Sequence, residues 1–357
     1  MRVGLVIYGR LDKRSGGFLY DCQLVRYLRQ QGDEVTVISL PWQSYGRHLT
    51  HNFSPVLWQQ LANGRFHILL QDELNHPSLF LLNKWLRARH SSPNITIVHH
   101  LRQSEARPAW QNRLYRVVER AYLASVDGYI FNSHTTRQAA AAVLGQVARP
   151  YVVAPPAGDR FGLSVDEAEI TRRAHADGPL RLLFVGNIMR RKGLHTLLAA
   201  VAQLPVGCVE LAVVGETAVE PSYYRSLQLQ LAALGERVTV YGRLPDTSLS
   251  SLMQKSHVLV VPSSYEGFGI VYLEGMGAGL PAVATTEGGV GEIVTNGVNG
   301  FLIPPEDEQM LAQKLFRLHQ NRPQLAAMGR AALARWRQHP AWADSMARIR
   351  AFLLRQC

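Results

Sequence analysis

Residues 262–279 read PSSYEGFGIVYLEGMGAG, and they follow an apolar run, HVLVV, at 257–261. Such a continuous apolar run is typical of a strand that is buried on both faces of a parallel sheet. A glycine-rich turn around Phe268 comes next, and it leads into a predicted helix that carries Glu274 about one turn inside. Free backbone N–H groups and the positive dipole end of a helix favour an anion at such a turn. Because a carboxylate one turn further on can accept two ribose hydroxyls, the stretch predicts a phosphate-plus-sugar site.

The same stretch carries a resemblance to a known family. Glu266 and Glu274 are separated by seven residues, which resembles the E-x7-E signature of retaining nucleotide-sugar glycosyltransferases with two Rossmann-like domains. This is the GT-B architecture, and the pattern is similar to glycosyltransferase family four. The resemblance is strong over most of residues 180–310 and weaker in the first half. Three further blocks match in order and spacing: RLLFVGNIMRRKGLHTLLAAV (181–201), VTVYGRLP (238–245) and PAVATTEGGVGEIVTNGVNGFLIPPED (281–307).

The resemblance implies an α/β fold of two Rossmann-like domains that face each other across a cleft. A chain of 357 residues exceeds the usual size of one domain, which agrees with two. A break at 155–159, followed by a polar and charged segment, predicts the hinge. The predicted parts are an N-terminal acceptor-binding domain (1–160), a linker (161–178), a C-terminal nucleotide-sugar-binding domain (179–338) and a C-terminal helix that crosses back onto the first domain (339–357).

The resemblance also assigns donor-binding residues. In the family, an arginine after the first glycine of the 186–193 loop and a lysine before the second glycine hold the donor diphosphate. Lys192 matches that lysine, whereas Asn187 stands where the arginine is often found, so Arg190 or Arg191 would supply the charge. Lys192, Glu266 and His99 are the predicted catalytic residues. The predicted donor-binding residues are Gly16, Gly17, Asn187, Arg191, Lys192, Arg243, Leu244, Glu266, Gly267, Phe268, Gly269, Ile270 and Glu274.

Two adjacent histidines, His99 and His100, follow a predicted strand in the first half of the chain. Apolar strands at 3–8, 34–40 and 95–98, with helices between them, predict a doubly wound parallel sheet. His99 and His100 fall just past the third of these strands, and ligands collect at the carboxyl ends of strands in such sheets. The position of His99 resembles that of the family's histidine beside the transferred sugar; a buried histidine that donates to a backbone carbonyl is the alternative. The family often has Asp where His100 stands, and we predict that His100 faces the acceptor.

Positive charge is concentrated in the first half. Residues 1–160 hold 19 Lys and Arg against 10 Asp and Glu, whereas residues 161–357 hold 19 against 17. This imbalance favours an anionic partner for the first half. A helix predicted over 107–123 would pack an apolar face on the core and present an arginine face to an anionic membrane surface or a phosphorylated acceptor. A solvated surface is the alternative, and nucleic acid is not expected because no nucleic-acid-binding motif accompanies the arginines. The apolar face is Trp110, Leu114, Val117, Val118 and Ala121, and the arginine face is Arg113, Arg116 and Arg120.

Together these features predict transfer of a sugar from a nucleoside diphosphate sugar to a hydroxyl on a lipid-linked or glycan acceptor. No cofactor is predicted, and no metal, because the chain has no D-x-D pair and its cations can stabilise the departing diphosphate. An oxidoreductase would need G-x-G-x-x-G after the first strand, and GRLDKRSGG at 9–17 does not provide it. A non-catalytic membrane- or polyanion-binding module would leave Glu266, Glu274 and Lys192 without a role. Three widely spaced cysteines and the lack of a signal-peptide pattern predict a cytoplasmic protein, peripheral on the inner face of the membrane.

Overall fold

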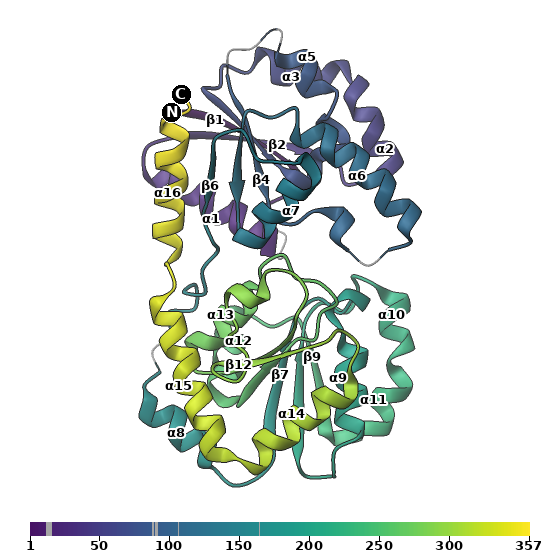
Figure 1. Cartoon of the computed structure of the whole chain (residues 1–357), viewed down its shortest axis with the longest axis vertical. Coiled ribbons are helices and arrows are strands. Elements are labelled where there is room, and N and C mark those ends of the chain that lie inside the picture. Colours follow the sequence, from purple (N-terminus) through teal and green to yellow (C-terminus); the bar gives the residue numbers. More distant parts are fainter. Residues whose placement is uncertain (12–15, 88, 90–91, 106, 164) are drawn as a thin grey trace. The chain divides into compact units, whose positions relative to one another are not determined.

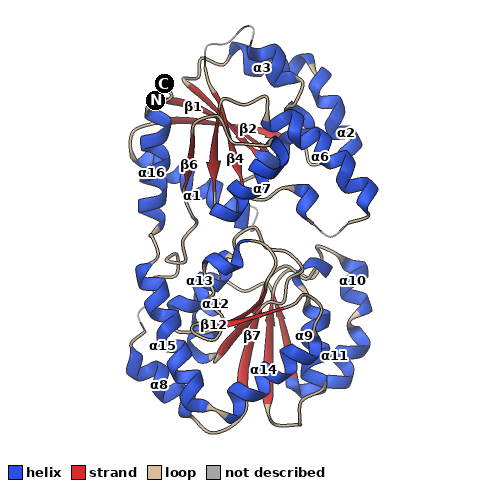
Figure 2. Cartoon of the chain, in the orientation of Figure 1, coloured by secondary structure: helices blue, strands red, loops and turns tan. Residues whose placement is uncertain are grey.

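The chain folds into two compact units, each built around one parallel sheet. The computed structural model describes residues 1–11, 16–87, 89, 92–105, 107–163 and 165–357. Unit 1 comprises Met1–Pro156 together with Trp342–Cys357, and unit 2 comprises Ala157–Ala341. In both units the strands lie between helices, as Figures 1 and 2 show. This is the predicted α/β fold with two Rossmann-like domains.

The sheet of unit 1 has six strands in the order β2-β1-β3-β4-β5-β6, and all neighbouring pairs are parallel. The central strands are apolar because helices cover both faces of the sheet. In β1, for example, six of the seven residues are buried. The strands are β1 (Arg2–Tyr8), β2 (Glu34–Leu40), β3 (Ile68–Asp72), β4 (Asn94–Val98), β5 (Gly128–Phe131) and β6 (Tyr151–Val153).

The sheet of unit 2 also has six strands, in the order β12-β11-β10-β7-β8-β9. Its pairs are again all parallel. The apolar run at 257–261 forms the short central strand β10 as predicted, between β7 and β11, whereas β12 was not predicted as a strand. The strands are β7 (Leu180–Val185), β8 (Val209–Val214), β9 (Val238–Gly242), β10 (Val258–Val260), β11 (Ala282–Thr285) and β12 (Gly300–Ile303).

Short sequence signals set several helix starts. The Ser133 side chain accepts a hydrogen bond from Thr136 N and so caps the start of α7. Ser54 caps α3 in the same way, and Pro55 stands at its first position. The helices of unit 1 are α1 (Gly16–Gln30), α2 (Tyr45–Thr50), α3 (Pro55–Asn63), α4 (His76–Leu79), α5 (Leu82–Arg87), α6 (Ala109–Leu123), α7 (His134–Leu144) and α16 (Trp342–Leu354). The helices of unit 2 are α8 (Glu167–His175), α9 (Leu194–Ala202), α10 (Pro221–Ser226), α11 (Gln228–Leu234), α12 (Asp246–Lys255), α13 (Ile270–Gly277), α14 (Glu308–Gln320) and α15 (Arg322–Gln338).

The C-terminal helix α16 is part of unit 1, as the resemblance implied. It packs beside α1 and β6 (Figure 1). The Nε atom of Arg350 donates to Oδ2 of Asp33 at 2.7 Å, and the rings of Trp342 and Tyr20 meet edge to face at 5.8 Å. Through these contacts, α16 packs as an integral helix of unit 1.

The segment predicted to be a linker contains a helix of unit 2 instead. Within 161–178, α8 begins after Asp166, whose side chain accepts a hydrogen bond from Glu169 N. Ile170 packs in a small cluster with Leu333 of α15. Most of the charged residues that suggested a linker face solvent on this helix, but Arg173 is buried and donates to the Gln254 and Ala278 carbonyls.

Helix α6 forms where it was predicted, but of its predicted apolar face only Val118 is buried. Trp110, Leu114 and Val117, which we predicted to pack on the core, are 67%, 51% and 67% exposed. Tyr122 is buried in their place, and its hydroxyl donates to Thr96 Oγ1 at 2.9 Å. The buried residues of α6 are Val118, Glu119, Tyr122 and Leu123. No helix in the described part of the chain is long and apolar enough to cross a bilayer.

Candidate active site

Three loops meet at the carboxyl edge of the second sheet. They follow the adjacent strands β7, β10 and β11, and they hold most of the predicted donor-binding residues. The loop after β7 approaches the loop after β10 so closely that a Cβ atom on Gly193 would lie 2.0 Å from the carbonyl oxygen of Pro262. Gly193 also has a φ of +70°, so only glycine fits there. The requirement for glycine at this position explains how the loop brings Lys192 against the β10 turn.

Lys192 and Glu266 form a buried ion pair at this edge. The Nζ atom of Lys192 donates to Oε1 of Glu266, and the hydroxyl of Ser263 donates to the same oxygen at 2.7 Å. Glu266 is 6% exposed. The Glu266 carbonyl also accepts from Gly289 N at 2.8 Å, so the turn after β11 supports the Glu266 backbone. Two of the three predicted catalytic residues are therefore in direct contact.

Electrostatics keep Glu266 ionised. Burial by itself raises the pKa of Glu266, but the charges of Lys192 and then Arg191 lower it to about 2. Burial lowers the pKa of Lys192, and the Glu266 carboxylate opposes that shift. Glu266 is thus an ionised acceptor of hydrogen bonds.

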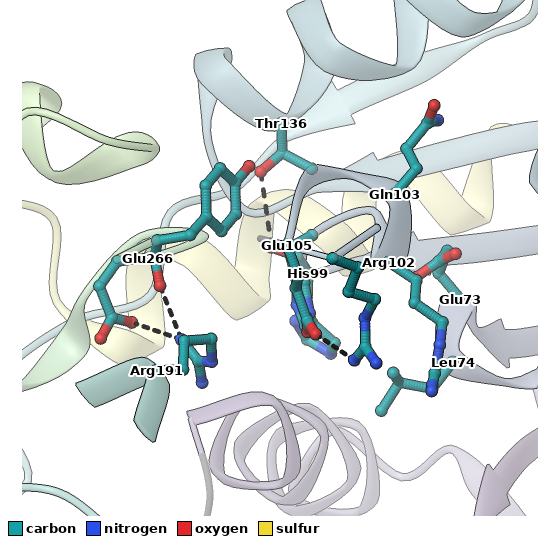
Figure 3. A network of polar contacts seen from close by, with 12 residues as sticks. Glu73, Leu74, His99, Arg102, Gln103, Glu105, Thr136, Arg191 and Glu266 are labelled. Carbon is teal, nitrogen blue, oxygen red and sulfur yellow. Dashed lines mark hydrogen bonds and ion pairs between the residues drawn. The ribbon is translucent and has the colours of Figure 1, made fainter. Parts of the chain in front are cut away.

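Arg191, rather than Arg190, lies beside the pair. Its Nη1 atom is 3.7 Å from Oε2 of Glu266 and donates to the Tyr265 carbonyl at 2.7 Å, as Figure 3 shows. The side chain of Arg190 is exposed, and its backbone N–H donates to Glu220. Of the two arginines proposed to replace the family arginine at Asn187, Arg191 therefore has the better placement.

Helix α13 carries Glu274 as predicted, but the carboxylate already has a partner. Glu274 is 3% exposed and accepts hydrogen bonds from the guanidinium of Arg160 at both oxygens. Burial raises the pKa of Glu274, and Arg160 opposes that shift. The sequence did not identify Arg160, because it stands in an irregular segment 114 residues away from its partner.

The other predicted donor residues divide into two groups. Phe268 is 4% exposed and its side chain belongs to the hydrophobic core of unit 2, so only its backbone could meet a ligand. Leu244 packs against the same core, and Arg243 is exposed after β9. Ile270 also packs against that core, and Gly267 and Gly269 have no side chain, so they could meet a ligand only through their backbone.

His99 follows β4 in unit 1, as predicted, and is held by a carboxylate. Its Nε2 atom lies 3.2 Å from Oδ1 of Asp21 on α1, and its carbonyl accepts from Asn132 Nδ2 at 2.8 Å. A Cβ atom on Gly17 would lie 3.2 Å from the imidazole ring, so the start of α1 covers it. Gly16 is exposed at that helix start, and residues 12–15 of the predicted turn lie outside the described part.

The neighbouring acids favour a protonated His99. Burial lowers its pKa, but Asp21 and then Asp72 raise it to about 9. Burial, followed by the charge of Asp21, raises the pKa of Asp72 to about 7. The sequence analysis did not identify Asp21. A signal was available, because Asp21 is a charged residue on the apolar stripe of α1, between Phe18 and Leu24.

The predicted acceptor residues of unit 1 lie at the surface or near it. His100 Nε2 is 3.0 Å from Oε1 of Glu105. Arg113, Arg116 and Arg120 are all exposed on α6, and Arg116 reaches the Ala142 carbonyl at 3.4 Å. His100 is therefore partly buried beside Glu105, whereas the three arginines face solvent.

Two groups of buried side chains in the described residues of unit 1 bring potential metal ligands within 4.8 Å of one another: Asp21, Asp72 and His99, and Glu73, His76 and Glu119. In the second group, His76 Nδ1 lies 3.0 Å from the Glu73 carbonyl and Nε2 lies 3.1 Å from the Tyr45 hydroxyl. Both ring nitrogens therefore already have partners. These hydrogen bonds account for the burial of His76 without a metal ion.

The carboxyl groups of Glu73 and Glu119 make folding dependent on pH. Burial raises the pKa of Glu73, which Figure 3 shows near Arg102, to about 7. Burial and then the charge of Glu73 raise the pKa of Glu119 to about 8. Both pKa values exceed 4.5, the ordinary pKa of a glutamate in an unfolded chain. The folded state therefore binds more protons than the unfolded state, and this stabilisation is complete below pH 4.5 and lost as the pH rises to about 8.

We expect Glu119→Gln to remove much of this dependence. The free energy of unfolding of the wild type should decrease from pH 5 to pH 8.5, and that of the variant should decrease less. At pH 8.5 the variant should be more stable by on the order of 1–2 kcal/mol, since each pKa unit is worth about 1.4 kcal/mol. Urea unfolding at the two pH values measures this, with Glu236→Gln on the exposed turn before β9 as a control. If the free energy of unfolding changed equally with pH in the wild type and in Glu119→Gln, the raised pKa of Glu119 would be contradicted.

Two family descriptions match this chain, one in each half. Residues 165–335 match the group 1 glycosyl transferases, and residues 13–157 match the glycosyl transferase 4-like domain. The chain therefore belongs to the glycosyltransferases with the GT-B fold and a 4-like N-terminal domain.

Individual relatives and solved structures agree with that class. A glycogen synthase of Mycobacterium tuberculosis is 32% identical over 155 residues, which is 43% of this chain and 37% of the relative. The sucrose-phosphate synthase of Thermosynechococcus elongatus has a similar structure, with a TM-score of 0.82 and 23% identity over 99% of this chain and 98% of that one. The HepE protein of Anabaena, solved with UDP and glucose, has a TM-score of 0.76 and 20% identity over 99% of both chains. At these identities the two structures establish the fold alone.

Proposed function

We propose that this protein transfers a sugar from a nucleoside diphosphate sugar to a hydroxyl group, with retention of the anomeric configuration. The observation that carries the proposal is the meeting of Lys192, Arg191 and Glu266 at the carboxyl edge of the second sheet. In open α/β sheets this edge is where ligands bind. Two cations and one ionised carboxylate match the two ends of an activated sugar: the diphosphate and the sugar hydroxyls.

The cations have a defined task in this reaction. The bond between the anomeric carbon and the diphosphate oxygen breaks, and its electron pair stays on that oxygen. The acceptor oxygen forms the new bond to the anomeric carbon, and its proton passes to the departing diphosphate. Lys192 and Arg191 stabilise the negative charge that develops on the diphosphate, as does the N-terminus of α13. Since these groups carry the charge, the proposed reaction requires no metal and no cofactor.

Glu266 and Glu274 bind hydroxyls in this proposal. An ionised carboxylate only accepts hydrogen bonds, so Glu266 suits the hydroxyls of the transferred sugar. Glu274 stands one turn inside α13 and is assigned the ribose. We assign neither residue the role of a nucleophile. Protonated His99 has one ring N–H at Asp21, and its other ring N–H is the proposed hydrogen-bond donor to the transferred sugar.

A panel of nucleotides tests the proposal. We expect one of UDP, GDP or ADP to raise the Tm of the full chain, because a ligand at 100 times its Kd stabilises the folded state by about 2.7 kcal/mol. UDP is the first to test, since the HepE protein was solved with UDP and glucose. The matching nucleotide sugars should be hydrolysed slowly without an acceptor, which release of the nucleoside diphosphate measures. No binding of any nucleoside diphosphate would overturn the proposal.

We infer that unit 1 also binds an anionic membrane surface. Its helix α6 exposes Trp110, Leu114 and Val117 in one stripe, next to the stripe of Arg113, Arg116 and Arg120. An apolar stripe flanked by arginines is typical of helices that lie in a membrane interface. A purely solvated face would not need the three exposed apolar side chains. This surface favours a lipid-linked hydroxyl as the acceptor, and a soluble glycan is the other candidate.

A further inference from the structure

Arg160 links the carboxylate of Glu274 to a second acid in unit 2. Its Nε atom donates to Oε1 of Glu274, and its Nη2 atom lies 3.4 Å from Oε2. On the other side, Nη1 lies 3.4 Å from both carboxylate oxygens of Asp246, in the first turn of α12. One guanidinium therefore spans two carboxylates, one of them buried and one half exposed.

The segment that carries Arg160 is fixed against α13. A Cβ atom on Gly158 would lie 2.5 Å from the carbonyl carbon of Leu273 and 2.8 Å from the Glu274 nitrogen, so only glycine permits this approach. Trp336 Nε1 donates to the Gly158 carbonyl at 3.2 Å. The guanidinium also stacks on the ring of Phe161, 4.2 Å from its centre. Arg160 is therefore held by its own segment and does not depend on Glu274 for its position.

The contacts with Arg160 leave hydrogen-bonding capacity on Glu274. A carboxylate offers about four lone-pair directions, two on each oxygen. Arg160 takes one direction on each oxygen, so each oxygen can still accept a further hydrogen bond. A carboxylate bound in this way cannot turn about its terminal bond without losing both contacts with the arginine.

We propose that Arg160 is the positioning residue of the ribose subsite: it holds the Glu274 carboxylate in a fixed orientation for hydrogen bonds from the hydroxyls of a nucleotide ribose, and Asp246 holds Arg160 from the far side. This inference rests on the proposed function, because it assumes that a nucleoside diphosphate binds at α13. Arg160 touches the carboxylate and not the ligand, so it is a positioning residue rather than a catalytic one.

The charge of Arg160 adds a second effect that can be measured. Burial raises the pKa of Glu274, Arg160 lowers it, and Asp246 raises it. Without Arg160, the pKa of Glu274 rises further, so more of the carboxyl is protonated at a given pH. A protonated carboxyl loses acceptor capacity, and binding of the two hydroxyls weakens as the pH falls. A residue with a purely structural role would not shift this pH profile.

The experiment compares two ligands in three proteins by calorimetric titration between pH 5.5 and pH 8. The ligands are the nucleoside diphosphate identified by the panel and its 2′,3′-dideoxy analogue, and the proteins are the wild type, Arg160→Met and Arg160→Lys. We expect Arg160→Met to weaken binding of the nucleoside diphosphate, which carries both ribose hydroxyls (the diol ligand), roughly tenfold. The pH range over which this affinity is lost should also shift to higher pH. The dideoxy analogue should bind equally to all three, and Arg160→Lys should recover part of the loss. Arg172→Met, which removes an exposed arginine from α8, is the matched control and should change nothing.

The outcomes separate the two proposals. A wild type that binds no nucleoside diphosphate overturns the proposed function. A wild type that prefers the diol ligand, with Arg160→Met showing the same preference and the same pH profile, overturns the role of Arg160 alone. Tighter binding by Arg160→Met also overturns it, because Arg160 would then block the subsite. Where Arg160→Met is poorly folded, Arg160→Lys carries the test, since it keeps a cation in the same place.

Discussion

Lys192→Ala is expected to lower kcat by roughly 100- to 1,000-fold, the effect of removing one group that stabilises developing charge in a transition state. Lys192 is the cation closest to Glu266 and stands on the loop that Gly193 brings against the β10 turn. Its loss leaves the developing charge on the diphosphate to Arg191 and backbone N–H groups. The rate of nucleoside diphosphate release from the donor sugar, at saturating donor, measures the effect.

Two further proteins make this prediction specific. Arg190→Ala removes the exposed neighbouring cation and should stay within about threefold of the wild type, because exposed charges contribute little. Lys192→Ala removes the closest ionic partner of a buried carboxylate, and the loss of such a partner can cost up to roughly 3–5 kcal/mol of stability. The double variant Lys192→Ala/Glu266→Gln removes that charge as well, so it should fold better and remain inactive. Equal losses in Arg190→Ala and Lys192→Ala, or a Lys192→Ala enzyme within fivefold of the wild type, would contradict the role of Lys192.

The family resemblance identified Lys192 and Glu266, and the fold explains why they meet. Each residue stands in a loop directly after a strongly apolar strand, and both strands are in the middle of the sheet. Because parallel strands end at the same edge, residues 74 positions apart in the chain are brought together. The apolar strands are visible in the sequence, whereas their order in the sheet is seen in the structure.

The pairing of Arg160 with Glu274 could not be found in that way. Arg160 is in neither a strand nor a helix, and its approach to α13 depends on Gly158 fitting against the helix backbone. Nothing in the spacing of residues 155–161 marks that fit. Asp21 is an intermediate case, because a carboxylate on an apolar helix stripe is a signal even when its partner His99 is 78 residues away.

Helix α6 shows why periodicity alone did not identify the buried face. The sequence has two apolar stripes: one includes Trp110, Leu114 and Val117, and the other includes Tyr122 and Leu123. Both have a helical period, so the pattern predicts a helix in either case. The second stripe is buried because the Tyr122 hydroxyl reaches Thr96 on β4 and because the Glu119 carboxylate accepts backbone N–H groups of the preceding loop. These tertiary contacts leave Trp110 and its neighbours exposed.

That exposed stripe supports the second large effect that we expect. The triple variant Arg113→Ala/Arg116→Ala/Arg120→Ala should bind vesicles of 30% anionic lipid roughly 100-fold more weakly, since each arginine near the surface contributes about 1 kcal/mol. Vesicle sedimentation at 0.05 M salt measures the partition constant. Binding of the wild type should weaken at 0.5 M salt because the charges are screened. Trp110→Ser should also reduce binding, and that reduction should persist at high salt, because it comes from lost apolar contact.

A matched triple variant decides whether the position of the arginines matters or only the net charge. Arg26, Arg29 and Arg47 are also exposed in unit 1, on α1 and α2, so their replacement by Ala changes the net charge by the same amount. If α6 is the membrane surface, this control should keep most of its binding, because its arginines lie on α1 and α2 and not on α6. Equal losses in the two triple variants would mean that charge alone drives binding, and unchanged binding in the α6 variant would exclude α6 as the contact. Either result would also remove the argument for a lipid-linked acceptor, because that argument rests on the exposed stripe of α6.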